Sequence, residues 1–217
     1  MQGWLPLFPL QVVWLPDAEL PLHIFEDRYK EMIAEVLRDK LEFGVVLANE
    51  RGIVNTGCTA TVERVLREYP DGRLDILALG RRRFEIERVN EERAFLRGEV
   101  DYFDDDVDND VDKDDETLPE DESRARAIAG YNELRALTAD SPLPSSETFD
   151  PQLSFRLARP IQDLGLRQAL LTARSEAERL RQLAEFLPGF LIRQRRIERV
   201  KQVAPRNGHG GKAPGIQ

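Results

Sequence analysis

The residues best suited to acid–base chemistry lie in the segment 21–33, PLHIFEDRYKEMI. His23, Glu26 and Asp27 are side-chain types that transfer protons in general acid–base catalysis. The segment contains no serine or cysteine that could serve as a nucleophile beside them. His23 falls between apolar residues on an expected strand, and the two acids fall in the first turn of an expected helix, where the helix dipole favours negative charge. We therefore interpret the cluster as the polar side of a strand-to-helix switch.

Zinc, disulfide and nucleotide chemistry lack the residues they need. A single cysteine, Cys58, excludes an intramolecular disulfide, and two histidines, His23 and His209, are too few to complete a Cys/His zinc site. The tail sequence GHGGKA at 208–213 contains Gly-Lys, but Ala213 stands where a phosphate-binding loop needs a hydroxyl group. The sequence therefore predicts no metal site, no phosphate-binding loop and no cofactor.

A run of acidic residues over 104–122 suggests a calcium site. An EF-hand loop needs a glycine at its sixth position and a glutamate at its twelfth. A loop starting at Asp104 would place Asn109 and Asp115 there, and a start at Asp106 fits no better. Because blocks of like charge repel one another, we expect a solvated linker or long loop. Whether the run attracts divalent ions weakly stays open.

Charge is unevenly distributed along the chain. The net charge of −9 includes thirteen acidic residues and one lysine in 101–122, and six basic residues with one acid in 193–206. Arg81, Arg82 and Arg83 form a second basic cluster, which could simply solvate an edge strand. The segment 193–206 contains no aromatic residue on which a base could stack. With an acidic domain overall, nucleic-acid binding is the weaker hypothesis.

The first hundred residues are expected to be mainly β. Short apolar and β-branched segments, among them QVVWLP at 11–16, alternate with turn residues, and Pro70-Asp71-Gly72 is a strong turn signal. Gly80 is expected to end a strand, and another begins at the arginines that follow. Many short strands in about 100 residues are typical of a small barrel or sandwich. One helix interrupts them, with an apolar stripe of Phe25, Tyr29, Met32, Ile33, Val36 and Leu37.

The second half of the chain follows the helical period. Ser175 and Glu178 have the spacing of a capping box, and Pro188 followed by glycine is expected to end the helix that they begin. The expected helices are 122–137, 153–173 with a bend near Pro160, 175–187, and a separate basic helix over about 190–203.

Two stretches resemble a known family. The first, LPLFPLQVVWLPDAELPLHIFEDRYKEMI at 5–33, resembles the opening of the Lon protease N-terminal (substrate-binding) domain, with Leu15-Pro16-Asp17 where the family has Phe-Pro-Gly. The second, GCTATVERVLREYPDGRLDILALGRRRFEI at 57–86, resembles a signature of a Gly-x-x-Ala-x-Val strand, an Asp-Gly-Arg turn and a strand ending in Gly-x-x-Arg-Phe. The helical part, 123–190, is similar in arrangement more than in letters.

The resemblance implies an α+β fold, a PUA-like small β-barrel with one inserted helix followed by a helical bundle subdomain. The expected units are a barrel over 1–103, an acidic linker or loop over 104–122, a helical subdomain over 123–203 and a disordered tail over 204–217. Phe25 is expected to enter the core, and Glu26 and Arg28 to fix the strand–helix corner through charged hydrogen bonds. The signature residues with implied structural roles are Pro21, Phe25, Glu26, Arg28, Tyr29, Gly57, Gly72, Gly80, Arg83 and Phe84.

The implied function is binding of unfolded or damaged polypeptide segments without catalysis, for example as an adaptor in proteolysis with a protease or chaperone partner. The ATPase module and the Ser–Lys protease domain of full-length Lon have no counterpart in these 217 residues. An exposed apolar groove between barrel and helices would hold the client. Trp4, Phe8 and Trp14 are candidates for its lining, because large aromatic residues dominate such contacts. A place in the core is the alternative for each.

The rival hypothesis is RNA binding, since PUA-like barrels also serve RNA-binding proteins; it rests on fold analogy alone. No apolar run approaches the ~20 residues of a membrane helix, and the N-terminus has no basic residue before its apolar stretch. Together with the single cysteine, these features predict a cytoplasmic protein without a membrane partner. The sequence does not indicate the oligomeric state.

Overall fold

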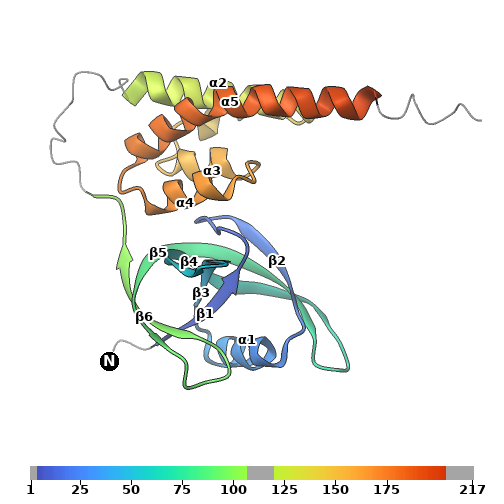
Figure 1. Ribbon diagram of the computed structural model, residues 1–217, viewed down its shortest axis with the longest axis vertical. Coiled ribbons are helices and arrows are strands. Elements are labelled where there is room, and N and C mark those ends of the chain that lie inside the picture. Colours follow the sequence, from blue (N-terminus) through green and yellow to red (C-terminus); the bar gives the residue numbers. More distant parts are fainter. Residues whose placement is uncertain (1–3, 107–119, 204–217) are drawn as a thin grey trace, which may run out of the picture.

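The computed structural model describes residues 4–106 and 120–203, so most of the acidic run and the tail lie outside the described residues. The strands form one unit, and helices α2 to α5 lie over one end of it (Figure 1). Along the chain the elements are β1 (Leu5–Leu10), β2 (Glu19–Ile24), α1 (Asp27–Asp39), β3 (Phe43–Asn49), β4 (Gly52–Glu68), β5 (Leu74–Asn90), β6 (Arg97–Phe103), α2 (Glu120–Leu137), a 3-10 helix (Ser145–Glu147), α3 (Leu153–Ala158), α4 (Leu164–Thr172) and α5 (Glu176–Val203).

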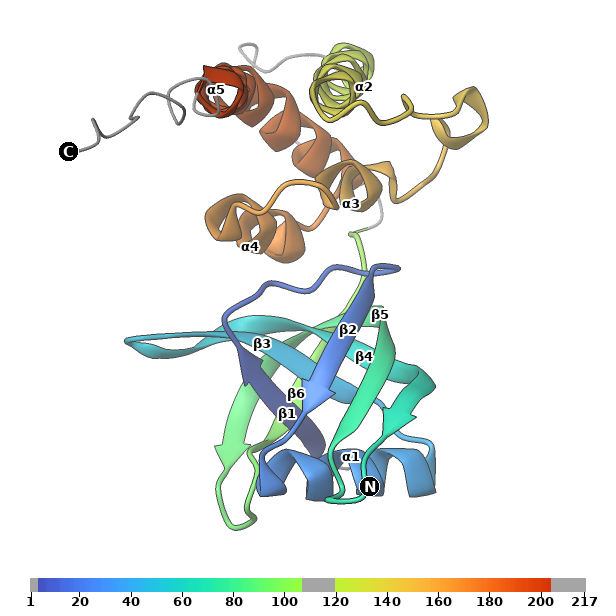
Figure 2. The same ribbon diagram turned by 90° about the vertical axis from the view of Figure 1, so that its right-hand side faces the viewer.

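The six strands form one sheet that closes on itself into a small barrel, with β2 as an added edge strand (Figure 2). Their order is β2-β5-β4-β3-β1-β6, and β6 also pairs with β5, so that β1, β3, β4, β5 and β6 close a ring. β1 pairs with β3 in parallel and with β6 in antiparallel orientation. β2 lies outside this ring and pairs with the first half of β5, from Glu19 opposite Leu79 to Ile24 opposite Leu74.

β5 is a single strand of 17 residues that passes through Gly80. The prediction that a strand ends at Gly80 was therefore wrong. Before Gly80 the strand pairs with β2, and after it with β6, so one strand serves two partners. Glycine is needed here because a Cβ would lie 2.2 Å from the Leu15 carbonyl oxygen. The Gly80 N–H donates to the Ala18 carbonyl at 2.9 Å.

The segment 11–16 is irregular, although its composition predicted a strand. It leaves β1 and crosses the barrel end that faces the helices, where the Trp14 indole donates a hydrogen bond to the Ala18 carbonyl at 3.1 Å. A turn follows at Asp17, whose φ is 54°. Val13 and Leu15 are buried, and this burial explains the apolar composition that resembled a strand.

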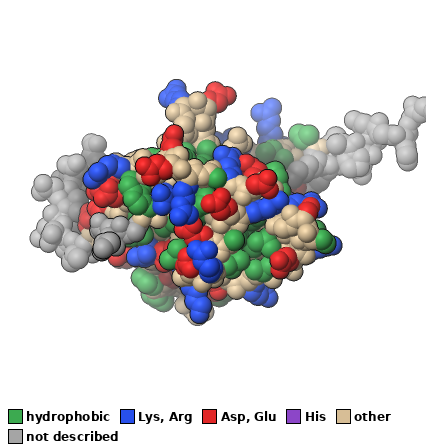
Figure 3. Space-filling model, turned by 90° about the horizontal axis from the view of Figure 1, so that it is seen from below, with side chains coloured by type: hydrophobic (Ala, Val, Ile, Leu, Met, Phe, Trp, Pro, Cys, Tyr) green, Lys and Arg blue, Asp and Glu red, His purple; other side chains and the backbone are tan. Residues whose placement is uncertain are grey.

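Helix α1 lies at the opposite end of the barrel (Figure 1). Four of the six residues of the predicted stripe are buried, Tyr29, Met32, Ile33 and Val36. Leu37, the last residue of the stripe, is 39% exposed, so the prediction was wrong there. Seen from this end, charged side chains of both signs are spread over the surface with hydrophobic ones between them (Figure 3).

The strand–helix corner before α1 was predicted only in part. The expected contact between Glu26 and Arg28 is present, with Arg28 Nε donating to the Glu26 carboxylate at 2.9 Å. Phe25 was expected in the core, but its side chain is 59% exposed, so that prediction was wrong. Because α1 begins only at Asp27, Phe25 precedes the helix and stacks on the His23 ring with centroids 5.9 Å apart.

The second signature shapes the interior of the barrel around Phe84, which is fully buried. Gly57 lies opposite Phe84 in the β4–β5 register. A Cβ at Gly57 would come within 2.5 Å of the Phe84 ring, and one at Gly44 within 2.7 Å. The two glycines therefore provide the space that the ring fills. Gly72 occupies the turn before β5 with φ at 81°, a conformation that favours glycine.

Helix α5 is one continuous helix of 28 residues that contains Pro188. The prediction of a helix end at Pro188 was therefore wrong. Leu187 and Leu191 are buried on either side of the proline, and Leu187 lies directly against Gly130 of α2. This packing holds together a helix that proline alone tends to interrupt. None of the described helices has the length and apolar character needed to cross a membrane.

The other helix boundaries agree better with the sequence. α3 and α4 are separated around Pro160, where a bend was expected. Ser175 Oγ accepts the Glu178 N–H at 3.2 Å, which is one half of the predicted capping box. The Glu178 carboxylate accepts the N–H of Arg174 at 3.3 Å, in place of the expected N–H of Ser175.

Candidate functional site: a cleft between the barrel and the helices

A buried network of charges joins the helices to the barrel. We call it the junction network; it consists of Arg83 on β5, Asp105 after β6, Ser154 on α3, and Glu176 and Arg179 on α5. Arg179, with 0% of its side chain exposed, is at its centre. Its two terminal nitrogens donate to the two Asp105 oxygens at 2.6 Å each, and Nε donates to Ser154 Oγ at 2.8 Å.

The remaining contacts of the junction network satisfy both carboxylates. Arg83 donates to Asp105 at 2.6 Å, and its other terminal nitrogen donates to the carbonyls of Leu171 and Ala173. Glu176 pairs with Arg179 at 2.9 Å and accepts the Ser154 hydroxyl at 2.6 Å. Such charge-assisted, partly bidentate hydrogen bonds fix both distance and orientation. The network therefore sets how the helices are placed on the barrel.

The two carboxylates of the network respond differently to burial. Burial disfavours the charge on Asp105, but hydrogen bonds and charges from Arg179 and Arg83 outweigh it and hold the pKa of this carboxyl below its usual range. Burial dominates at Glu176 and raises its pKa, although Ser154 and Arg179 oppose the shift. Asp105 belongs to the run that was expected to be a solvated linker, and for this residue the expectation was wrong.

Arg83 was also considered as part of a basic surface. Its burial in the junction network removes it from any such surface. Arg81 is exposed and pairs with Glu63 at 2.7 Å. Arg82 pairs with Glu42 at 3.0 Å. Acidic partners thus neutralise a cluster that looks strongly basic in the sequence.

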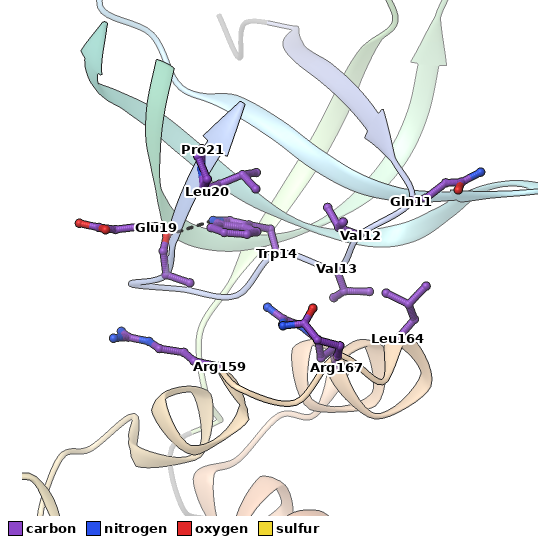
Figure 4. Close-up of a pocket in the computed structure, with 12 residues that line it drawn as sticks. Gln11, Val12, Val13, Trp14, Glu19, Leu20, Pro21, Arg159, Leu164 and Arg167 are labelled. Atoms are coloured by element: carbon purple, nitrogen blue, oxygen red, sulfur yellow. Dashed lines mark hydrogen bonds between the residues drawn. The ribbon is translucent and has the colours of Figure 1, made fainter. Parts of the chain in front are cut away.

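A cleft of about 530 Å³ opens between the two units that the network joins (Figure 4). The barrel wall comes from the irregular segment 11–14 and from the start of β2. The helix wall comes from the connection between α3 and α4 and from α4 itself. The lining residues are Gln11, Val12, Val13, Trp14, Ala18, Glu19, Leu20, Pro21, Arg159, Gln162, Leu164 and Arg167.

The cleft offers apolar surface on both walls. Val12 on the barrel side is 37% exposed, and Leu164 on the helix side is 39% exposed. Trp14 and Leu20 lie deeper and are largely buried. Arg159 crosses between the walls by donating to the Asp17 carbonyl. A cleft of this size, lined by seven apolar and five polar or charged residues, can hold side chains of an extended peptide.

Of the three aromatic residues proposed to bind substrate, only Trp14 lines this cleft. Phe8 is buried in the barrel core, with its ring centroid 4.2 Å from that of Tyr29. Trp4 precedes β1 and is partly exposed, but it does not line the cleft. Pro21, singled out as a structural signature residue, also lines the cleft from β2.

Sequence reasoning missed Val12, Leu164, Arg159 and Arg167. Val12 was assigned to a strand, and the other three belong to helical segments about 150 residues further along the chain. Only the docking of the helices onto the barrel brings these residues together. No local pattern in the sequence signals that proximity.

A second, smaller cleft of about 170 Å³ lies at the α1 end of the barrel. Leu37 and Leu41 line it, together with Val62 of β4. Leu37 is 39% exposed, like Leu164 in the larger cleft. The two leucines therefore form a natural pair for comparing the two sites.

Two reactive side chains that the structure describes, His23 and Cys58, do not line the cleft. His23 Nδ1 lies 2.6 Å from Asp75 Oδ1, and these residues face each other in the β2–β5 register. Tyr69 OH donates to the other Asp75 oxygen at 2.8 Å. Burial raises the pKa of the Cys58 thiol to about 12, so it is not a nucleophile at neutral pH. Among residues 4–106 and 120–203, no group of His, Cys, Asp and Glu could hold a metal ion.

Comparison with known proteins decides the family. The model of the ATP-dependent protease La (LON) substrate-binding domain matches residues 4–189. The chain belongs to this family. A Lon protease from Parabacteroides distasonis is 30% identical over 123 residues, which cover 52% of this chain and 15% of that protein. The chain thus matches only a small part of that relative's length.

Two solved structures share the fold, and the more similar of the two agrees with the family assignment. The crystal structure of a Lon N-terminal domain protein from Xanthomonas campestris is 28% identical, with a TM-score of 0.62 over 85% of this chain and 98% of that one. The N-terminal domain of a Mycobacterium avium complex Lon protease shares the fold at 17% identity, with a TM-score of 0.60 over 86% and 98%. The predicted family and the α+β fold class are confirmed.

Proposed function

We propose that the cleft between barrel and helices binds apolar segments of unfolded or damaged polypeptides without transforming them. Membership of the Lon substrate-binding domain family supports a substrate-binding role. The observation that carries the proposal is the cleft itself, whose two walls expose Val12 and Leu164 toward a common space. Exposed apolar surface in a concave site is typical of surfaces that bind another chain.

The proposed role extends to proteolysis. A client held in the cleft would be presented to a protease or chaperone partner, and this chain would act as the adaptor. The binding step needs neither nucleotide nor metal, because apolar contact alone can hold an extended segment. The described reactive groups, a buried thiol and a histidine paired across two strands, fit a role in binding better than one in catalysis.

The experiment is a titration of the protein with one model client in two states. We expect a fluorescently labelled, reduced and unfolded protein to bind in the absence of nucleotide, and its native form to bind much more weakly. Because apolar contacts dominate, the affinity should hold or rise slightly from low to moderate salt. Fluorescence anisotropy measures the affinity for each form of the client and its dependence on salt. Equal affinity for the unfolded and native forms would contradict the proposal.

The same salt series with labelled RNA tests the alternative. RNA binding depends on phosphate contacts, so its affinity falls steeply as salt rises. The structure weakens this alternative, since Arg83 is buried and Arg81 and Arg82 are paired with acids. Tight and salt-sensitive RNA binding, together with no preference for the unfolded chain, would favour RNA over polypeptide.

A further inference from the structure

Arg167 is a buried arginine that lines the cleft without an acidic partner. Its residue exposure is 6%. One terminal nitrogen donates to the Ile161 carbonyl at 3.3 Å, and Nε has no hydrogen-bond partner among the described residues. Burial alone lowers the pKa of the guanidinium, and no neighbouring charge raises it. An arginine nevertheless stays protonated at neutral pH, so a positive charge lies beneath the surface of the cleft.

The other buried arginines show what Arg167 lacks. Arg179 and Arg83 are as deeply buried, and both donate to the Asp105 carboxylate at 2.6 Å. Burial of a charge without a counter-charge is costly, and proteins normally compensate it with a partner. Among the described residues, Arg167 therefore stands apart as a buried cation whose guanidinium still has donors to offer.

Arg167 belongs to the lining of the cleft. Figure 4 shows Arg167 on the helix wall below Trp14, between Arg159 on one side and Leu164 on the other. Arg159 adds a second positive charge to the same wall, and Glu19 on the barrel wall is the acidic residue of the lining. Glu19 is exposed at the surface, and no hydrogen bond or ion pair joins it to Arg167. Arg159 already donates to the Asp17 carbonyl, so Arg167 is the arginine of this wall that a carboxylate entering the cleft would meet without a competing partner.

We propose that Arg167 recognises an acidic side chain of the bound client, so that the cleft selects an aspartate or glutamate flanked by apolar residues. This inference rests on the function proposed above and adds a specificity to it. Arginine suits the task because its planar guanidinium presents several donors in the geometry of a carboxylate. A client carboxylate would supply the counter-charge that the described residues do not.

An acidic side chain within a continuous segment fits better than a chain end. Apolar surface lies on both sides of Arg167, with the exposed Val12 and Leu164 on one side and Pro21 toward the other (Figure 4). A segment that passes over Arg167 covers both sides. A terminal carboxylate at the same place would leave one of them exposed to water.

The test compares two short apolar peptides that differ at one central position, glutamate in one and glutamine in the other. Both have blocked ends, and binding to the intact protein is measured by fluorescence anisotropy. We expect the glutamate peptide to bind about tenfold more tightly, as a charge-assisted hydrogen bond allows. Arg167→Gln should abolish the preference for the glutamate peptide. Arg167→Lys should keep part of it, since lysine retains the positive charge but lacks the paired donors of the guanidinium.

Controls separate the alternatives. Arg159 lines the same wall, but it is exposed and already donates to the Asp17 carbonyl, so Arg159→Gln should lower the preference less than Arg167→Gln does. A third peptide, with the central glutamine and a free C-terminal carboxylate, tests a chain end as the source of the charge. Circular dichroism shows whether each variant folds. If a variant does not fold, the comparison of the two blocked peptides with wild-type protein still tests the inference.

The peptide experiments separate failure of the inference from failure of the proposed function. Equal affinity of wild-type protein for the glutamate and glutamine peptides would overturn the inference while leaving the proposed function intact. So would a preference that Arg159→Gln removes and Arg167→Gln does not, or a preference that follows only the free C-terminus. Failure of all the peptides and of the unfolded client to bind would contradict the proposed function itself.

Discussion

Arg179→Ala will lower the free energy of unfolding by about 3–5 kcal/mol, because the substitution leaves two partly buried carboxylates without their main partner. Asp105 loses both of its bidentate bonds from Arg179, and Glu176 and Ser154 lose theirs. Arg83 remains at Asp105, but a single arginine cannot replace the fork that Arg179 presents. Chemical denaturation followed by circular dichroism measures the change.

Arg181→Ala is the matched control for this prediction. Arg181 lies two residues further along α5, is partly exposed, and faces Glu185 at 3.9 Å. Exposed pairs of this kind contribute about 0–1 kcal/mol. If Arg179→Ala were as mild as Arg181→Ala, the junction network would not be what fixes the helices on the barrel.

Phe84→Ala will cost about 3–5 kcal/mol of unfolding free energy, the usual range for removing a buried phenylalanine ring. Phe84 is fully buried, and its ring fills the space above Gly44 and Gly57. No backbone neighbour can collapse into the cavity without disturbing the β4–β5 pairing. Urea denaturation of the variant and the wild type gives the difference.

Phe25→Ala provides the contrast. On the sequence alone this substitution was expected to be as damaging, but Phe25 is 59% exposed, and we now expect a loss below about 1 kcal/mol. A large loss at Phe25 and a small one at Phe84 would mean that the barrel interior is assigned to the wrong residues.

The features that depend on neighbouring residues along the chain were predicted from the sequence. The stripe from Tyr29 to Val36 is buried as expected, because one helix face must cover the barrel end. The turn at Gly72 and the cap at Ser175 also follow from neighbouring residues. The prediction for Phe25 was wrong because the apolar period extended two residues before the true start of the helix at Asp27, and a residue that precedes a helix need not lie on its buried face.

Tertiary contacts decided the elements that the sequence misassigned. Pro188 does not end α5, because Leu187 and Leu191 pack on both sides of it. Gly80 does not end β5, because the strand exchanges one partner for another there. Proline and glycine at these positions do favour the end of a helix or strand locally, but longer-range packing outweighed that preference.

The candidate site was the least accessible to sequence reasoning. A groove between barrel and helices was expected, and Trp14 was named among its residues. Arg167 and Leu164 could not be named, since an arginine in a helix usually faces solvent and nothing in the sequence places Leu164 beside Val12. Asp105 was likewise indistinguishable from the acidic residues around it, and only its contacts with Arg83 and Arg179 reveal its role.

The junction network also determines the geometry of the cleft. Because the network orients α3, α4 and α5 on the barrel, it also sets the separation of Val12 and Leu164 across the cleft. Client binding and the stability of the junction are therefore expected to depend on the same contacts.

The most direct measurement of the central claim compares Leu164→Gln with Leu37→Gln in binding a labelled unfolded client. Both leucines are 39% exposed and lie on helices, but Leu164 lines the large cleft and Leu37 the small one. We expect Leu164→Gln to weaken binding about tenfold, as loss of an important apolar contact does. Leu37→Gln should leave the affinity unchanged. Unchanged binding in Leu164→Gln, or a loss confined to Leu37→Gln, would contradict the assignment of the client site to the cleft between barrel and helices.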